Sequence, residues 1–324
     1  MLNTAMASDE NSEEGRLIIG KAVIVRLVYE GEDISPIWNK LFGRVSADTG
    51  DAAAFLDLSI ILQCVGQADK ASLAQRAALD ISRSYRIRNG DGSGSRILAF
   101  VTAGDFMANT PIEFLLEGSD TTLLLDYIDA DTKDLADVPD HDVAFVAVGE
   151  SAANLPVLEN LERLVSGWRG AIMNNAPRKI MGLTRDGVAE TFKDEPSILA
   201  PATTRVSRDA LEKVAAGKIG IAELVAETEY PVIVRPVGTH AGKAMERIAS
   251  QAELAGYLKN HHETQYYLAP FIDYSGPDGK FRKQRIAFIN GKAFASHLAV
   301  SDHWMVHYLS AGMAKYEDRR SEAG

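Results

Sequence analysis

The segment YPVIVRPVGTHAGKAMERI, residues 230 to 248, joins a short apolar run to a loop that contains two glycines. Alternation along a strand places Val232 and Val234 on one face and Arg235 on the other, so we expect Arg235 to leave the core side for a cleft. Exposed loop amides and Lys243 can wrap a triphosphate together with Arg235. The spacing is not that of a P-loop, which has four residues between its glycines and a hydroxyl residue after its lysine. The segment therefore predicts a phosphate site of another kind.

After this segment the pattern predicts a helix, a strand and a hairpin. The helix spans 250–260 and the strand 265–274. The hairpin strands, 281–289 and 292–300, are joined by Asn-Gly, which favours the two positive backbone angles of a type I′ turn.

Before this segment, residues 96–176 alternate short apolar strands with helices, which predicts a small parallel sheet of Rossmann-like kind. No G-x-G-x-x-G follows its first strand, so a nicotinamide site is unsupported. Within this region, Thr110, Pro111 and Glu113 predict a capping box at the start of a helix. Residues 177–324 form the second predicted domain.

The N-terminal part shows three different compositions. Residues 1–15 are polar and we expect them to be disordered. The region 16–88 contains apolar residues at helical spacing from 51 to about 86, which predicts a helical hairpin resembling one tetratricopeptide unit. The glycine-rich segment 89–95 predicts a flexible linker.

The order of these elements resembles the ATP-grasp family, over residues 96 to 300. The resemblance rests on PVIVRP and GTHAGKAMERI as strand and flap, on YLAPFIDY as the adenine hinge, and on the hairpin FRKQRIAFINGKAFAS. A proline-marked strand, ILAPAT, and a linker with a helix precede them. It implies an α/β (α+β) fold, with a Rossmann-like pre-ATP-grasp domain before an incomplete ATP-grasp fold and a helical hairpin in front of both.

The resemblance also implies roles for particular residues. Arg235 would contact the α- and β-phosphates of ATP, and the flap would close over the β- and γ-phosphates. Backbone groups near the hinge would form hydrogen bonds with adenine, and Arg285 or Lys283 would neutralise charge on the transferred phosphoryl group. The implied cofactor-binding residues are Arg235, Gly238, Thr239, Gly242, Lys243, Leu268, Phe271 and Asp273. The implied activity is that of a ligase that joins a small-molecule or peptide carboxylate to an amine through an acyl phosphate.

Three departures from the family pattern stand out. The strand cation is Arg235 where lysine is usual, and arginine and lysine are not interchangeable. The hinge lacks the common acidic residue, which leaves Asp273 as a substitute for the ribose. No Glu-x-Asn follows Lys280, so the carboxylates that hold Mg²⁺ are missing and Mg²⁺ binding is in doubt. We expect either a shortened form of a longer ligase or a protein that binds nucleotide weakly and catalyses nothing.

Composition excludes several classes. With 324 residues and 46% of them apolar, the chain can bury two or three cores, and its net charge of −11 argues against binding nucleic acid or anionic lipid. One cysteine, Cys64, excludes an internal disulfide and suits a reducing compartment. No basic leader or apolar span is visible, so we expect a cytoplasmic protein.

Other interpretations stay open. The N-terminal helices could bind a protein partner while the nucleotide fold is degenerate, which would make the chain an interaction protein. His303 and His307 share a helix face but lack the glutamate of H-E-x-x-H, so we expect no zinc site. The group Trp304, Met305 and Tyr308 is interpreted as core packing. A serine hydrolase is unsupported because Ser151, in the sequence GESAA, lacks the G-x-S-x-G context.

Overall fold

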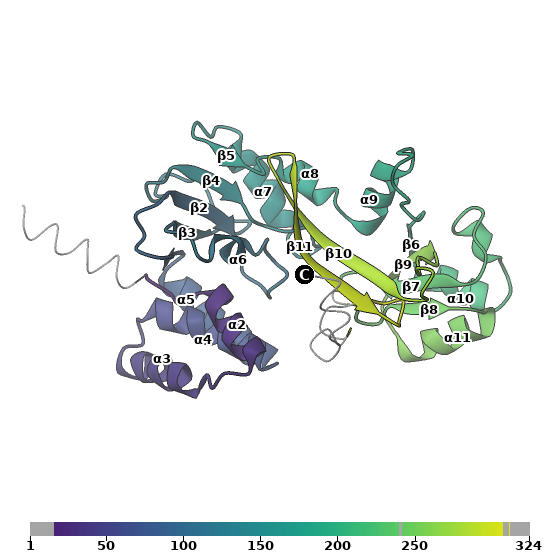
Figure 1. Ribbon diagram of the computed structural model, residues 1–324, viewed down its shortest axis with the longest axis horizontal. Helices are drawn as coiled ribbons and strands as arrows, with labels where there is room; N and C mark the ends of the chain where they lie inside the picture. Colours follow the sequence, from purple (N-terminus) through teal and green to yellow (C-terminus); the bar gives the residue numbers. More distant parts are fainter. Residues whose placement is uncertain (1–15, 240–241, 307–310, 312–324) are drawn as a thin grey trace, which may run out of the picture. The chain divides into compact units, whose positions relative to one another are not determined.

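The computed structural model describes residues 16–239, 242–306 and 311. The chain divides into two compact units, 1–184 and 185–324. Both mix helices with sheets, so the α/β class predicted from the sequence is confirmed (Figure 1). Among the described residues, no helix combines the length and apolarity needed to cross a bilayer.

The first unit is a five-stranded sheet with helices on both faces. Its strand order is β1-β3-β2-β4-β5, and only β1 runs antiparallel to its neighbour. The elements are α2 Lys21–Glu30, α3 Ser35–Ala47, α4 Ala52–Cys64, α5 Ala68–Ile81, β1 Ser84–Arg88, β2 Arg96–Val101, α6 Ile112–Leu116, β3 Thr122–Tyr127, β4 Val143–Val146, α7 Leu155–Val165, β5 Ile172–Met173 and α8 Pro177–Met181.

Alternate residues of the central strands supply two separate cores. Ile97 and Leu123 pack with α4 and α5 on one face, whereas Leu98 and Leu124 pack with α7 on the other. Helices therefore cover both faces, as expected for a largely parallel sheet. A third cluster joins α2, α3 and α4, so the N-terminal helices belong to the same unit as the sheet.

Two predictions for the first unit are wrong in detail. Residues 84–88, placed at the end of the predicted helical hairpin, form the edge strand β1, because Tyr85 and Ile87 alternate into the core while their neighbours do not. The segment 89–95 is not a linker between domains. It connects β1 to β2 within one sheet, and the Gly94 amide donates to the Asp120 carbonyl at 2.7 Å.

The capping box is also wrong. The helix α6 begins after Pro111 without a side-chain cap, and Glu113 instead accepts hydrogen bonds from the amides of Lys21 and Ala22, at 2.5 and 3.2 Å. These amides open α2, which lies far from Glu113 in the sequence. A local capping pattern could not reveal a carboxylate that caps a different helix.

The second unit contains an antiparallel sheet of order β6-β9-β7-β8 and a separate two-stranded ribbon, β10-β11. Its elements are α9 Arg185–Phe192, β6 Thr204–Ser207, α10 Arg208–Ala215, a 3₁₀ turn at Ile221–Glu223, β7 Val232–Pro236, β8 Glu246–Ile248, α11 Gln251–Asn260, β9 Gln265–Pro270, β10 Phe281–Ile289 and β11 Lys292–Ser301. The strand expected at 198–203 lies at 204–207 instead. The two prolines of the sequence PSILAP explain the shift, because proline cannot donate to a strand ladder.

One face of the four-stranded sheet packs on helices. Val232, Val234, Tyr266 and Leu268 are fully buried there with residues of α10 and α11. The β10-β11 turn has Asn290 at φ 49° and Gly291 at φ 75°, which confirms the predicted type I′ hairpin. The residues of the candidate site lie on the opposite face of the four-stranded sheet.

Candidate functional site

The face of the four-stranded sheet opposite α10 and α11 carries arginines. Because Val232 and Val234 point into the core, Ile233 and Arg235 point to the opposite face, as the sequence predicts. Arg235 pairs in register with Tyr267 on β9, and Tyr267 pairs with Arg205 on β6. The three side chains therefore form one row across the sheet.

Arg235 is a buried cation, with an exposed fraction of 7%. Its Nε donates to the Thr239 hydroxyl at 3.1 Å, and its guanidinium also donates to the Thr239 carbonyl. Within the described part of the chain no carboxylate pairs with it. Burial, together with the positive charge of Arg185, lowers the pKa of Arg235 to about 10. At neutral pH the group remains charged, so the site holds positive charge that no acid of the described residues offsets.

The predicted flap begins directly after Arg235. Gly238 and Gly242 adopt positive φ angles of 79° and 76°, which L side chains rarely adopt. The Thr239 hydroxyl donates to the Pro236 carbonyl at 2.9 Å, which holds the start of the loop against β7. Lys243 is exposed. The two residues between, His240 and Ala241, lie outside the described residues.

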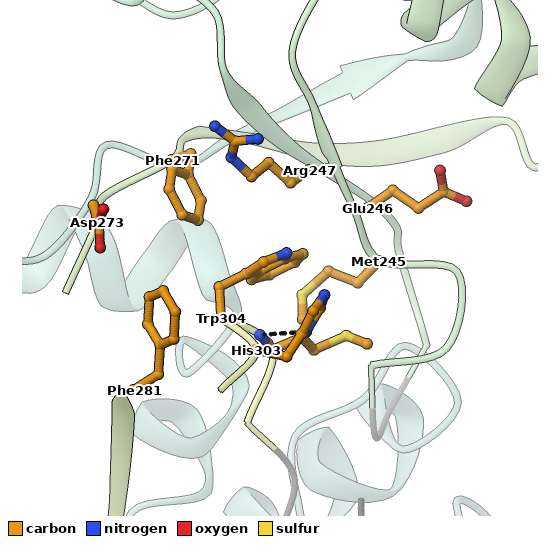
Figure 2. Close-up of a pocket in the computed structure, with 9 residues that line it drawn as sticks. Met245, Glu246, Arg247, Phe271, Asp273, Phe281, His303 and Trp304 are labelled. Carbon is orange, nitrogen blue, oxygen red and sulfur yellow. Dashed lines mark hydrogen bonds between the residues drawn. The ribbon is translucent and has the colours of Figure 1, made fainter. Parts of the chain in front are cut away.

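A cavity of about 600 Å³ opens on the same unit (Figure 2). Residues from β8, the segment after β9, the start of β10 and the segment after β11 line it. They are Met245, Glu246, Arg247, Phe271, Asp273, Phe281, His303, Trp304 and Met305. A volume of this size falls in the range of small-molecule sites, roughly 300–1,000 Å³.

Aromatic rings form the wall of this cavity. The Arg247 guanidinium lies 4.6 Å from the centre of the Phe271 ring, and Trp304 meets Phe271 edge to face at 5.8 Å. Figure 2 shows Arg247 above the Phe271 ring and Trp304 below it, with Phe281 beside them. Tyr274 supports this group, because its hydroxyl donates to the Trp304 carbonyl at 2.5 Å. The wall can stack a flat ring.

The rim of the cavity is charged. Asp273 is exposed, and hydrogen bonds from Ser275 lower the pKa of its carboxyl, so Asp273 is ionised at neutral pH. The Glu246 side chain points away from the rings in Figure 2, and its Oε1 lies 3.3 Å from His261 Nε2. Asp273 is therefore the carboxylate that faces a ligand in this cavity.

Register links the cavity to Arg235. Arg247 pairs with Ile233 on β7, and Arg235 lies two residues further along that strand. Arg235 and Arg247 consequently project from the same face of the sheet, about 7 Å apart along the strand direction. A ligand with a ring and a chain of anionic groups can reach both.

The backbone of β9 also contributes an open edge. Phe271 donates to the Pro231 carbonyl at 3.0 Å, so the even-numbered residues of β9 direct their backbone groups toward β6. The strand β6 begins at Thr204, opposite Leu268, and no described strand lies beside Pro270 on that side. The Pro270 carbonyl can accept a hydrogen bond there, although proline offers no N–H. The side chain of Leu268 is in the core, so this residue can contribute only through its backbone.

The cations of the ribbon, Lys283 and Arg285, are not among the residues that line the cavity. Lys283 Nζ donates to the Val306 carbonyl at 3.4 Å, and Arg285 is exposed opposite His297. Of the predicted site residues, Phe271 and Asp273 line the cavity, whereas Arg235, Gly238, Thr239, Gly242 and Lys243 are not among its lining residues. Lys283 and Arg285 stand on a neighbouring element and their role stays a prediction.

Comparisons with known proteins give only structural matches. No protein-family model and no curated protein matches the chain. Similar solved structures include the D-alanine–D-alanine ligase of Helicobacter pylori, at 13% identity and a TM-score of 0.32 over 51% of this chain and 48% of that one. The RimK domain ATP-grasp protein of Sphaerobacter thermophilus matches at 15% identity and a TM-score of 0.37, over 66% and 75% of the two chains. The carboxyaminoimidazole ribonucleotide synthase of Aspergillus clavatus, solved with ATP, matches at 11% identity and a TM-score of 0.39, over 64% and 54%.

The chain is thus similar, at TM-scores of 0.32 to 0.39, to one structure described as ATP-grasp, to one ligase and to one synthase. It spans about half the length of the Helicobacter pylori ligase, 48%. The comparisons therefore leave the class of ligand to be inferred from the charges and the cavity of this chain.

Several residues of the candidate site were missed in the sequence. Arg247 was part of the quoted segment, and its position opposite Ile233 in a strand pair would have placed it beside Arg235. Trp304 and Met305, interpreted as core packing, line the cavity instead. Their position depends on how the chain turns after β11, for which the sequence gives no local signal. Tyr308 lies outside the described residues.

The described residues do not supply a metal centre. No group of three His, Cys, Asp or Glu side chains among them could hold a metal ion. Of the two histidines weighed for zinc, His303 lines the cavity, where its Nδ1 accepts a hydrogen bond from the Met305 amide at 3.1 Å. His307 and the tail acids Glu317, Asp318 and Glu322 lie outside the described residues.

Proposed function

We propose that this chain binds ATP on the face of its second-unit sheet that lies opposite α10 and α11. The observation that carries the proposal is Arg235, a buried guanidinium with no carboxylate partner among the described residues and with Arg185 as its charged neighbour. A buried charge without a counter-charge is costly, so an anionic ligand stabilises such a site. Phosphate suits a guanidinium because the two can form paired hydrogen bonds.

The rest of the ligand fits what lies beside Arg235. The adenine ring would stack on the wall of Phe271 and Trp304, with the Pro270 carbonyl as an acceptor for its amino group. Asp273 would accept hydrogen bonds from the ribose hydroxyls. The phosphates would follow the sheet face to Arg235, with Lys243 and the loop amides of the flap closing over the β- and γ-phosphates.

We further propose that the chemistry is that of a carboxylate–amine ligase. The γ-phosphoryl group of ATP would pass to an oxygen of a substrate carboxylate, and ADP would leave. An amine nitrogen would then attack the acyl carbon and release phosphate, leaving an amide. Lys283 or Arg285 would neutralise the charge that develops on the transferred group. Such catalysis needs positioning and positive charge, and no protein nucleophile.

Mg²⁺ does not fit the described residues. Phosphoryl transfer in related chemistry uses metal ions held by carboxylates, and the described residues offer no such cluster. ATP binding is therefore the part of the proposal to test first.

The test is isothermal titration of the full chain with ATP, with and without added Mg²⁺. We expect a single site, and we expect Arg235→Ala to weaken it roughly 10- to 100-fold, because a hydrogen-bonded charge contributes about 1.5–3 kcal/mol. Arg235→Lys keeps the charge and should recover part of the affinity.

The matched control is Arg26→Ala, which removes an exposed arginine of the first unit that pairs with Glu117 at 2.5 Å. This variant should bind ATP as the parent does. If the parent chain gave no heat with millimolar ATP, the proposal would be overturned and a role in protein interaction would be favoured. Equal loss in both variants would also overturn it.

A further inference from the structure

The first unit has a second cavity, of about 610 Å³, that the proposed ATP site does not use. It lies at the end of the sheet where β2 and β3 begin, next to the edge strand β1. The lining residues are Arg16, Ser84, Tyr85, Arg86, Arg88, Asp91, Gly92, Ser93, Gly94, Arg96, Thr122, Leu124 and Pro139.

The cavity follows from how the sheet is covered. Tyr85 and Ile87 of β1 point into the core shared with α4 and α5, so Arg86 and Arg88 point to the other face. On that other face, α7 packs on the central strands through Leu98 and Phe100. The arginine face of β1 is at the sheet edge and contributes nothing to that core.

Positive charge dominates the lining. Four guanidiniums face one carboxylate, that of Asp91, in a chain whose net charge is −11. Arg96 forms an ion pair with Asp140 at 3.1 Å, but the Asp140 side chain is 91% exposed, and such pairs are weak. Among the described residues, neither Arg16 nor Arg88 has a carboxylate partner. Four arginines thus gather in one cavity of an acidic chain, and for Arg16 and Arg88 the described residues supply no carboxylate.

Register explains why two of these arginines converge. Arg88 pairs with Thr122 on β3, and Thr122 pairs with Arg96 on β2. Arg88 and Arg96 therefore lie in one row on one face, separated by a small side chain. Two guanidiniums across a single intervening strand can bind the same multiply charged anion.

The glycine-rich connection between β1 and β2 shapes the cavity. Gly92 has a φ of 73°, and a Cβ at this position would come within 2.9 Å of the Arg88 side chain and 3.2 Å of the Thr122 hydroxyl. The amides of Gly92 and Gly94 already donate to carbonyls of the chain, so they are not anion ligands. The role of glycine here is to leave room for the Arg88 side chain.

We propose that this cavity binds an organic phosphate with at least two negative charges, of nucleotide size or smaller. The guanidiniums supply the hydrogen-bond donors, and Leu124 and Pro139 supply an apolar wall for the organic part. The planar donor fork of arginine matches phosphate, and four such groups favour a ligand with more than one charge. This site is separate from the proposed ATP site and does not depend on it.

The test uses inorganic pyrophosphate as the probe and the full chain with Arg235→Ala, which removes the proposed second-unit phosphate contact. Titration calorimetry should show one pyrophosphate per chain. Arg88→Ala and Arg96→Ala should each weaken binding at least 10-fold, Arg88→Lys should recover part of it, and Arg26→Ala should leave it unchanged. Hydrogen exchange should show protection of residues 84–96 on binding.

Citrate at equal ionic strength serves as the polycarboxylate comparison. Binding of citrate as tight as that of pyrophosphate would overturn the assignment to phosphate. The site itself would be refuted if pyrophosphate failed to bind, or if binding survived both arginine replacements in chains whose circular dichroism matches the parent. Gly92→Ala tests the geometry independently, because displacement of Arg88 should weaken binding without removing any charge.

Discussion

At the scale of single residues, Asp57 is the least expected group in the protein. It is 1% exposed, on a helix whose other buried residues are apolar apart from Ser59, and its carboxylate accepts hydrogen bonds from the amides of Ile19 and Gly20 at 2.8 and 3.1 Å. These amides belong to the start of α2, where a carboxylate offsets the helix dipole. Burial nevertheless dominates, and it raises the pKa of Asp57 to about 7.

This raised pKa predicts that stability falls as pH rises from about 4 to about 7. In the unfolded chain Asp57 loses its proton near its ordinary pKa of 3.8, whereas the folded chain keeps it until about 7. Between these values unfolding releases a proton, so the free energy of unfolding drops by up to about 1.4 kcal/mol per pH unit. Asp57→Asn stays neutral and should flatten this slope. Urea unfolding of both proteins at pH 4.5, 6 and 8 measures it.

The control for that prediction is Asp140→Asn, which alters a carboxylate that is 91% exposed. This variant should keep the parent slope. A slope that Asp57→Asn leaves intact would show that Asp57 ionises at its ordinary pKa despite its burial.

Asp273 provides a test of whether the site recognises a ribose. Its ionised carboxylate lines the cavity beside the aromatic wall, and among the described residues no cation lies within hydrogen-bond distance of it. We expect the parent to bind ATP about 10-fold more tightly than 2′-deoxy-ATP, since one hydrogen bond to a charged group contributes about 1.5–3 kcal/mol. Asp273→Ala should bind both equally. Competition titration against inorganic triphosphate, which has no ribose and should bind both proteins alike, separates this effect from general loss of the site.

At the scale of elements, the sequence predicts best where a single periodic pattern decides the outcome. The alternation in β7 places Arg235 correctly, and Asn290-Gly291 predicts the hairpin turn, because both depend on neighbours in the chain. Prediction from the sequence fails where the position of a residue depends on a partner that is distant along the chain. Glu113 caps α2 instead of its own helix, and Trp304 reaches the cavity through a turn that has no local signature.

The flap gives a matched pair of glycines for a test at this scale. Gly238 and Gly242 have nearly equal positive φ angles, so alanine costs about 1 kcal/mol in backbone strain at each. At Gly238 nothing lies within 4 Å of an added Cβ, whereas at Gly242 the Met305 sulfur lies at 2.8 Å. Because Met305 lines the cavity, Gly242→Ala should weaken ATP binding at least 10-fold and Gly238→Ala less than about 3-fold.

Replacement of Met305 by alanine should remove most of the difference between the two glycine variants. A double-mutant cycle over Gly242 and Met305, read as ATP affinity, measures this coupling. Additive effects would mean that residue 242 and the Met305 side chain are not sterically coupled.

At the scale of the whole molecule, the two units have separate interiors. The clusters around α4, α7 and the five-stranded sheet contain residues of the first unit only, and the clusters around β7 and β11 contain residues of the second only. A ligand stabilises the unit that binds it, by an amount set by its concentration relative to its Kd. The two proposed sites lie in different units, so their ligands should act on different parts of one chain.

We therefore expect two unfolding transitions in scanning calorimetry of the full chain, each sensitive to a different ligand. ATP at about 100 times its Kd should stabilise the second-unit transition by about 2.7 kcal/mol, and pyrophosphate in the Arg235→Ala chain should raise only the first. Asp57→Asn assigns the transitions, since it changes the first unit and leaves the second alone. A single transition that both ligands raise together would show that the two units unfold as one body, and it would replace the picture of two independent sites with one of sites coupled through folding.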